Sequence, residues 1–125
     1  MATLTPAEYR SMVKPKHKYG AIRTEYNGAW YDSKAEAAYA AELDMMKRIG
    51  VVKDWWRQVP FVLHAVSSDG GFRTAIGKYI VDFKILGADD TVTYCDVKGV
   101  ATPLFKWKKK HAEAEYGVKI VLVKR

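Results

Sequence analysis

The chain has 125 residues and a mass of 14.2 kDa, with 49% hydrophobic and 28% charged residues. This size and composition predict one packed globular domain and exclude a disordered chain. No apolar run approaches the roughly 20 residues that cross a bilayer, so we expect no membrane partner. The N-terminus lacks a continuous apolar segment, and one cysteine cannot form an internal disulfide. We therefore expect a cytoplasmic protein.

Positive charge is concentrated at the two ends of the chain. The formal net charge is +7, and residues 1–23 carry five basic and one acidic side chain. Residues 98–125 carry eight basic and two acidic side chains, whereas residues 24–97 carry eight and eleven. This distribution favours a polyanionic partner held by the ends, with carboxylates between them. Ordinary solubilising charge would give a similar pattern.

Capping and turn signals predict the first elements. Thr5-Pro6-Ala7-Glu8 resembles a capping box and predicts a short N-terminal helix that ends before Pro15. Asn27-Gly28 predicts a small hairpin over residues 26–31. Ser33 is a predicted N-cap for an alanine-rich helix that reaches Ile49.

The rest of the chain alternates strand-like and helical segments. Strands are predicted at 51–58, 61–66, 79–86, 92–98 and 118–123, and a helix at 102–116. Pro60 is expected to separate the first two strands. The order of elements predicts a mixed α/β domain, in which helices cover a sheet.

Two aspartates lie inside strongly apolar strands. If residues 87–91 connect the strands, Leu86 pairs with Val92 and Asp82 lies directly across from Asp96. Directly opposed residues have Cβ atoms about 4.5–5.5 Å apart, so two carboxylates there would repel and raise one pKa. Mg²⁺ or Mn²⁺ would offset this repulsion. Solvent-facing charges on a half-exposed sheet are the alternative interpretation, although burial makes unpaired charges costly.

Strand alternation places other side chains around this pair. Tyr79, Val81, Phe83 and Ile85 are expected to share the face of their strand opposite to Asp82. Lys98 is expected on the face of Asp96, and Cys95 on the other face as a small buried residue. Of the adjacent tryptophans 55 and 56, one ring is expected in the core. His17, His64 and His111 have no metal-ligand spacing and are expected to be incidental.

Asp82, followed in the next strand by Asp96-Val97-Lys98, resembles the PD-(D/E)XK signature of restriction-endonuclease-like nucleases. Val81 stands where the motif has proline. The chain is most similar to small phage-encoded Holliday-junction-resolving endonucleases of this class. The similarity extends over Lys18-Tyr19-Gly20, residues 31–36, Gln58-Val59-Pro60-Phe61 and the lysine-rich segment after Gly99. It implies a restriction-endonuclease-like α/β core, with a mixed central sheet flanked by helices.

The resemblance also implies the roles of individual residues. Asp82, Asp96 and the Val97 carbonyl would bind Mg²⁺, with Mn²⁺ as a substitute, and Lys98 would assist the attacking water. The helix beginning after Ser33 would supply a further carboxylate. Helical periodicity favours Glu42, whereas the resemblance favours Glu36. Gln58 matches an accessory polar position.

Branched or duplex DNA is the expected partner. Candidate DNA contacts are the basic residues Lys16, Lys18, Arg23, Lys106, Lys108, Lys109 and Lys110. The implied activity is magnesium-dependent endonuclease cleavage, most closely that of a Holliday junction resolvase in the host-cell cytoplasm. Two cuts per junction imply a homodimer. A nicking or flap endonuclease of the same fold, or a non-catalytic nucleic-acid-binding module, would fit the same residues.

Overall fold

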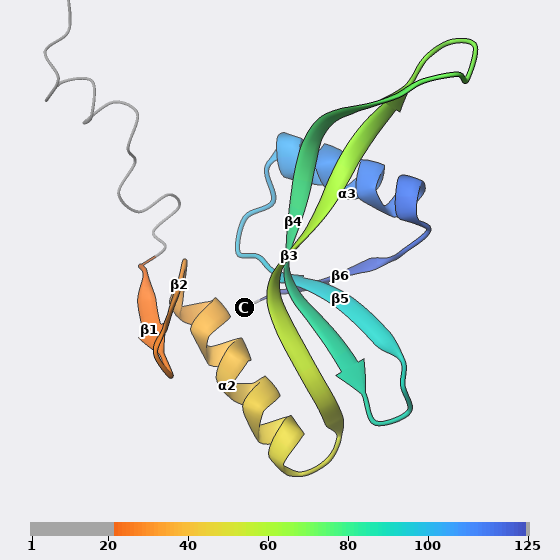
Figure 1. Cartoon of the computed structure of the whole chain (residues 1–125). Coiled ribbons are helices and arrows are strands. Elements are labelled where there is room, and N and C mark those ends of the chain that lie inside the picture. Colours follow the sequence, from red (N-terminus) through yellow and green to blue (C-terminus); the bar gives the residue numbers. More distant parts are fainter. Residues whose placement is uncertain (1–21, 125) are drawn as a thin grey trace, which may run out of the picture.

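The computed structural model describes residues 22–124, which form an α/β domain (Figure 1). The predicted N-terminal helix and the candidate DNA contacts Lys16 and Lys18 lie outside the described residues. The elements are β1 (Thr24–Tyr26), β2 (Ala29–Tyr31), α2 (Lys34–Arg48), β3 (Val52–Val66), β4 (Arg73–Gly87), β5 (Val92–Val97), α3 (Pro103–Tyr116) and β6 (Ile120–Val123). Neither of the helices in this part of the chain is long and apolar enough to cross a membrane.

Local signals determine the first three elements as predicted. Asn27 and Gly28 both have positive φ, 50° and 83°, which is the geometry of a tight turn between β1 and β2. Ser33 caps α2, because its side chain accepts a hydrogen bond of 3.1 Å from the backbone N–H of Glu36. The bond orients the first turn of α2, and with it the Glu36 side chain.

The main sheet has the strand order β3-β4-β5-β6 and is mixed. β3, β4 and β5 are antiparallel neighbours, and β6 runs parallel to β5. A parallel pair needs a crossover, which α3 provides between β5 and β6. Leu86 pairs with Val92, which confirms the predicted register of β4 against β5.

Two strand boundaries were predicted wrongly. The two strands predicted at 51–58 and 61–66 are one continuous strand, β3 (Val52–Val66), in which Pro60 pairs with Ile80. β3 is an edge strand of the sheet, where a residue without a backbone N–H is tolerated. β4 begins at Arg73 rather than Tyr79, because its first part pairs with the end of β3 despite a sequence that shows no strand pattern.

The core consists of two clusters on either side of a twist in the β3–β4 ribbon. Figure 1 shows α2 beside one half of this ribbon and α3 beside the other. Val81 packs in the cluster that includes Ala112 of α3, whereas Phe83 packs in the cluster that includes Leu43 of α2. Val81 and Phe83, which were expected on one face of their strand, therefore pack in different clusters, because strands twist and the two helices cover different parts of the ribbon. Asp82 lies between these two residues, where the clusters meet.

Candidate active site

Three carboxylates are the buried polar side chains of residues 22–124. Glu36 is 6% exposed, Asp82 6% and Asp96 0%. They come from the first turn of α2, from β4 and from β5. Buried carboxylates are costly unless they are paired, hydrogen-bonded or bound to a cation.

Asp82 and Asp96 are joined by hydrogen bonds to the backbone of the opposite strand. The backbone N–H of Asp82 donates to Oδ1 of Asp96 at 2.8 Å, and that of Val97 donates to Oδ2 of Asp82 at 2.9 Å. The regular pairing of β4 with β5 ends one step earlier, at Phe83 and Cys95. The two aspartates therefore lie together as the register predicted. Each carboxylate replaces a backbone acceptor at the end of the ladder.

Asp96 is also hydrogen-bonded from the core. The Tyr79 hydroxyl donates to Oδ2 of Asp96, so both carboxylate oxygens of Asp96 have a protein donor. Tyr79 is buried in the cluster under α3. Asp96 is consequently the most rigidly held of the three carboxylates.

Burial is the main influence on the acidity of all three groups. It raises the pKa of Glu36 to about 7, with the nearby charges of Asp82 and Asp32 adding to the effect. Burial also raises the pKa of Asp82 and of Asp96, while the Lys98 ammonium opposes the rise at both. Mutual repulsion of the two aspartates was expected to raise one pKa, but the main causes of both shifts are burial, which raises the pKa, and backbone N–H groups and cations, which oppose the rise.

Two cations lie beside the carboxylates. Lys98 follows β5, and its Nζ lies 4.8 Å from the ring centroid of Phe105 in α3. Arg57 of β3 lowers the pKa of both Glu36 and Asp82. Its Nη2 donates to the Trp30 carbonyl oxygen at 2.8 Å.

Asp32 and Arg57 were not among the predicted site residues. Asp32 stands next to the N-cap of α2, and its negative charge raises the pKa of Glu36 and of Asp82. Arg57 is the partner of Phe83 across the β3–β4 ladder, one step from the position opposite Asp82. An arginine between Trp56 and Gln58, in a predicted strand, was the signal that could have identified it.

Gln58 and the two candidate helical carboxylates, Glu36 and Glu42, differ in their positions relative to Asp82. Gln58 is exposed and has a φ of 54°, and its neighbours pair with Val81 and Phe83, which places it opposite Asp82. Non-glycine residues rarely adopt this conformation, and when they do it is often near functional sites. Glu36 is buried beside Asp82, whereas Glu42 is exposed. Capping uses the backbone N–H of Glu36 and leaves its carboxylate directed to the site.

The described residues contain no group of three or more His, Cys, Asp or Glu side chains close enough to hold a metal ion. The donor set still fits Mg²⁺, which prefers oxygen ligands and is usually bound by one or two carboxylates while it keeps several waters. Oδ2 of Asp82 accepts a hydrogen bond from the Val97 N–H. The other carboxylate oxygen of Asp82 and the nearby Glu36 carboxylate are the oxygens that could bind the ion. Asp96 would bind an ion only by sharing oxygens that already accept hydrogen bonds.

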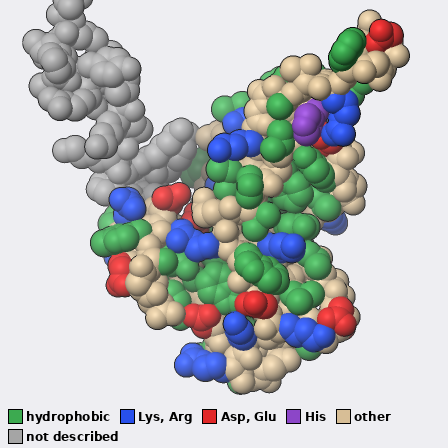
Figure 2. Space-filling model, in the orientation of Figure 1, with side chains coloured by type: hydrophobic (Ala, Val, Ile, Leu, Met, Phe, Trp, Pro, Cys, Tyr) green, Lys and Arg blue, Asp and Glu red, His purple; other side chains and the backbone are tan. Residues whose placement is uncertain are grey.

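The predicted DNA contacts within residues 22–124 differ in exposure. Arg23, Lys106 and Lys110 are exposed, whereas Lys108 and Lys109 are half-buried. Lys109 forms an ion pair of 3.3 Å with Glu113 and is less available to a phosphate. Figure 2 shows that Lys and Arg side chains are spread over the face that it draws rather than gathered in one patch.

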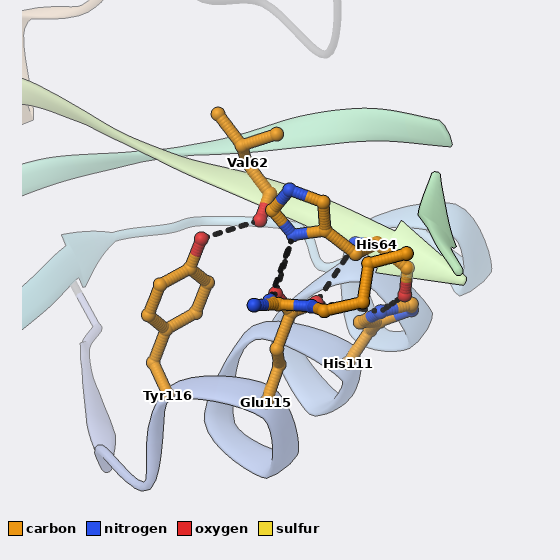
Figure 3. A network of polar contacts seen from close by, with 6 residues as sticks. Val62, His64, His111, Glu115 and Tyr116 are labelled. Atoms are coloured by element: carbon orange, nitrogen blue, oxygen red, sulfur yellow. Dashed lines mark hydrogen bonds and ion pairs between the residues drawn. The ribbon is translucent and has the colours of Figure 1, made fainter. Parts of the chain in front are cut away.

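Two histidines that were predicted to be incidental belong to a polar network (Figure 3). His64 of β3 and His111 of α3 both contact Glu115, with nitrogen–oxygen distances of 2.6 and 3.3 Å. The backbone N–H of His64 also donates to Glu115 at 2.8 Å. Sequence spacing could not reveal the network, because it joins residues on two elements that are far apart in the chain.

Residues 16–124 match the family model described as "Protein of unknown function (DUF1064)", and the chain belongs to this family. The match includes every element of the described structure, from β1 to β6. No curated protein and no solved structure matches the chain. The family description names no activity.

Proposed function

We propose that this protein is a metal-dependent, structure-selective DNA endonuclease with a restriction-endonuclease-like core. The observation that carries the proposal is the grouping of the buried Glu36, Asp82 and Asp96 beside Lys98. Buried carboxylates are costly unless they are paired, hydrogen-bonded or bound to a cation, and perturbed acids beside a lysine are typical of catalytic sites. The residues Asp82 and Asp96-Val97-Lys98 also stand in the order of the PD-(D/E)XK signature.

Asp82, Asp96 and Glu36 would hold Mg²⁺, with the Val97 carbonyl as a further oxygen donor. The bound ion would polarise the phosphoryl group and lower the pKa of a water molecule. Mn²⁺ is the expected substitute, because the donors are all oxygens.

The protein's own contribution is to position charge. The backbone hydrogen bonds to Asp82 and Asp96 fix both carboxylates before substrate binds. Lys98 would orient the attacking water and stabilise the charge that develops on the phosphate, and partial burial makes this charge more effective than on a surface. Arg57 would contact the phosphate from the opposite side of Asp82.

Four-way junctions are the substrate we favour, on the basis of the resemblance to phage resolving enzymes. Resolution needs two cuts, so the working form would be a homodimer with two sites. Its location would be cytoplasmic, in the host cell if a phage encodes it. A nicking or flap endonuclease with the same site differs only in the shape of DNA that it accepts.

Asp96→Asn tests the proposal against a module that only binds nucleic acid. Junction binding is measured in EDTA and cleavage in Mg²⁺, with Asp69→Asn in the loop between β3 and β4 as the matched control. The proposal predicts that Asp96→Asn abolishes cleavage but binds the junction as well as or better than the wild type, since a repelling charge is removed. Wild-type protein that binds DNA and shows no turnover with Mg²⁺ or Mn²⁺ would favour the binding module.

A further inference from the structure

A cavity of 530 Å³ lies between α3 and the parts of β3 and β4 that are farthest from α2. Its charged, aromatic and imidazole lining comes from His64, Arg73, Trp107, Lys110, His111 and Glu115. None of the four candidate catalytic residues lines it. Cavities of about 300–1,000 Å³ are typical of small-ligand sites.

One stripe of α3 faces the cavity. Trp107, Lys110, His111 and Ala114 are spaced i, i+3, i+4 and i+7, which places them on the same side of a helix. Ala112, on another side, is fully buried against the sheet. Trp107 is 72% exposed, so most of this side chain is open to a ligand.

The negative charge of Glu115 in the cavity is balanced by contacts with its neighbours. Glu115 accepts hydrogen bonds from the backbone and ring of His64 and from Nη2 of Arg73, the last at 2.8 Å. The His64 backbone N–H is the main cause that lowers the pKa of Glu115 to about 2. Only Nη2 of Arg73 contacts Glu115, and the Arg73 side chain is 59% exposed, so the other N–H groups of its guanidinium remain open to a phosphate.

Lys110 forms no ion pair with another residue of the described chain. The cavity therefore has an excess of positive charge next to an exposed aromatic ring. Lys110 and the Arg73 side chain are both exposed, so this charge is accessible on the surface.

We propose that this cavity binds an unpaired nucleotide of a nucleic-acid strand, with the base stacked on Trp107 and the phosphate held by Lys110 and Arg73. The inference rests on the proposed function, since a branched DNA substrate whose strands separate at the branch point would supply such a nucleotide next to the duplex that is cut. Aromatic stacking accepts any base, and a lysine and an arginine complement one phosphate. An acidic peptide would use the cations but would leave the exposed ring without a matching partner.

The test is the affinity of the full chain for a short fluorescein-labelled oligothymidine, measured by anisotropy in EDTA over a range of salt concentrations. Trp107→Ala is expected to weaken binding about 5- to 150-fold, the effect of losing one stacked base. Lys110→Gln is expected to reduce the slope of log affinity against log salt by about 0.7. Leu104→Ala, an exposed apolar change in the same helix, and Lys119→Gln are the controls and should bind as the wild type does.

The outcomes separate this site from the nuclease proposal. Oligonucleotide binding that is unchanged in both Trp107→Ala and Lys110→Gln would overturn the nucleotide site and leave the nuclease proposal intact. Competition by polyglutamate but not by unlabelled oligothymidine would also overturn it, in favour of an acidic peptide. Binding through Trp107 in a protein that never cleaves a junction would retain the site and overturn the nuclease.

Discussion

The backbone N–H of Asp82 donates a 2.8 Å hydrogen bond to the Asp96 carboxylate at the point where β4 and β5 cease to pair through their backbones. Val97 returns the interaction by donating to Asp82 at 2.9 Å. Each aspartate therefore continues the sheet as well as supplying negative charge. Removal of either side chain is expected to affect folding stability and activity together, whereas a change to asparagine keeps a side-chain oxygen that can accept the backbone hydrogen bond and removes the charge.

Tyr79→Phe tests how much the hydrogen bond from Tyr79 to Asp96 stabilises the fold. It removes the hydroxyl that donates to Oδ2 of Asp96 and leaves the ring in place. We expect the free energy of unfolding to fall by about 1.5–3 kcal/mol, the contribution of a hydrogen bond to a charged group. Urea denaturation measures the change. Tyr94→Phe, in which the ring keeps its contact with Phe61, is the control, and an equal loss in both variants would contradict the role of Tyr79.

Lys98→Gln tests the cation at the site. The variant loses the charge that lowers the pKa of Asp82 and Asp96 and that would stabilise the reacting phosphate. Single-turnover cleavage in Mg²⁺ is expected to slow about 10²–10³-fold, the usual effect of losing one preorganised donor. The exposed lysine change Lys119→Gln should leave the rate unchanged. A Lys98→Gln protein as fast as the wild type would remove Lys98 from the mechanism.

Glu36→Gln tests the pH dependence of stability in metal-free buffer. The folded protein keeps the Glu36 proton up to a pKa of about 7, whereas the unfolded chain loses it near 4.5. The contribution of this group to stability is thus fully present below pH 4.5 and is lost as the pH rises through about 7. Denaturant titrations at several pH values should show a flatter dependence for Glu36→Gln. Glu42→Gln, on the exposed side of the same helix, should keep the wild-type profile, and a similar flattening there would refute the assignment.

Glu115→Gln tests a carboxyl group whose pKa is lowered, rather than raised, in the folded protein. Hydrogen bonds, chiefly from the His64 backbone N–H, lower the pKa of Glu115 to about 2. Its contribution to stability is present above the unfolded value of 4.5 and is lost as the pH falls toward 2. Thermal unfolding should show a lower Tm for Glu115→Gln at neutral pH, with a smaller further loss in acid. An unchanged acid profile would mean that other groups govern acid unfolding.

The sequence predicted the parts of the fold that depend on local signals. Asn27-Gly28 and Ser33 specify a turn and a helix start through their own backbone preferences, and the hairpin and α2 begin where expected. The first part of β4 was missed, because residues from Arg73 pair with β3 rather than follow a pattern of their own. Pro60 misled the prediction, since its effect depends on whether a strand lies at the edge of the sheet.

The sequence predicted the two aspartates at the centre of the site but not the charged residues around them. Alternation and loop length placed Asp82 beside Asp96. Arg57 and Asp32 lie near Asp82 because of the twist of β3 and the packing of α2. No local sequence pattern encodes these two features. The same holds for His64, His111 and Glu115, which meet because α3 packs on the end of β3.

The most direct test of the account is cleavage of a labelled four-way DNA junction by the wild-type protein in Mg²⁺ and in EDTA, beside flap, linear duplex and single-stranded substrates. We expect paired, symmetric cuts in the junction that require the metal and disappear in Asp82→Asn but persist in Asp89→Asn. Equal cutting of every substrate would keep the nuclease and contradict its selectivity for structure. Tight binding without metal-dependent cutting of any substrate would contradict the central claim that Glu36, Asp82, Asp96 and Lys98 form a nuclease site.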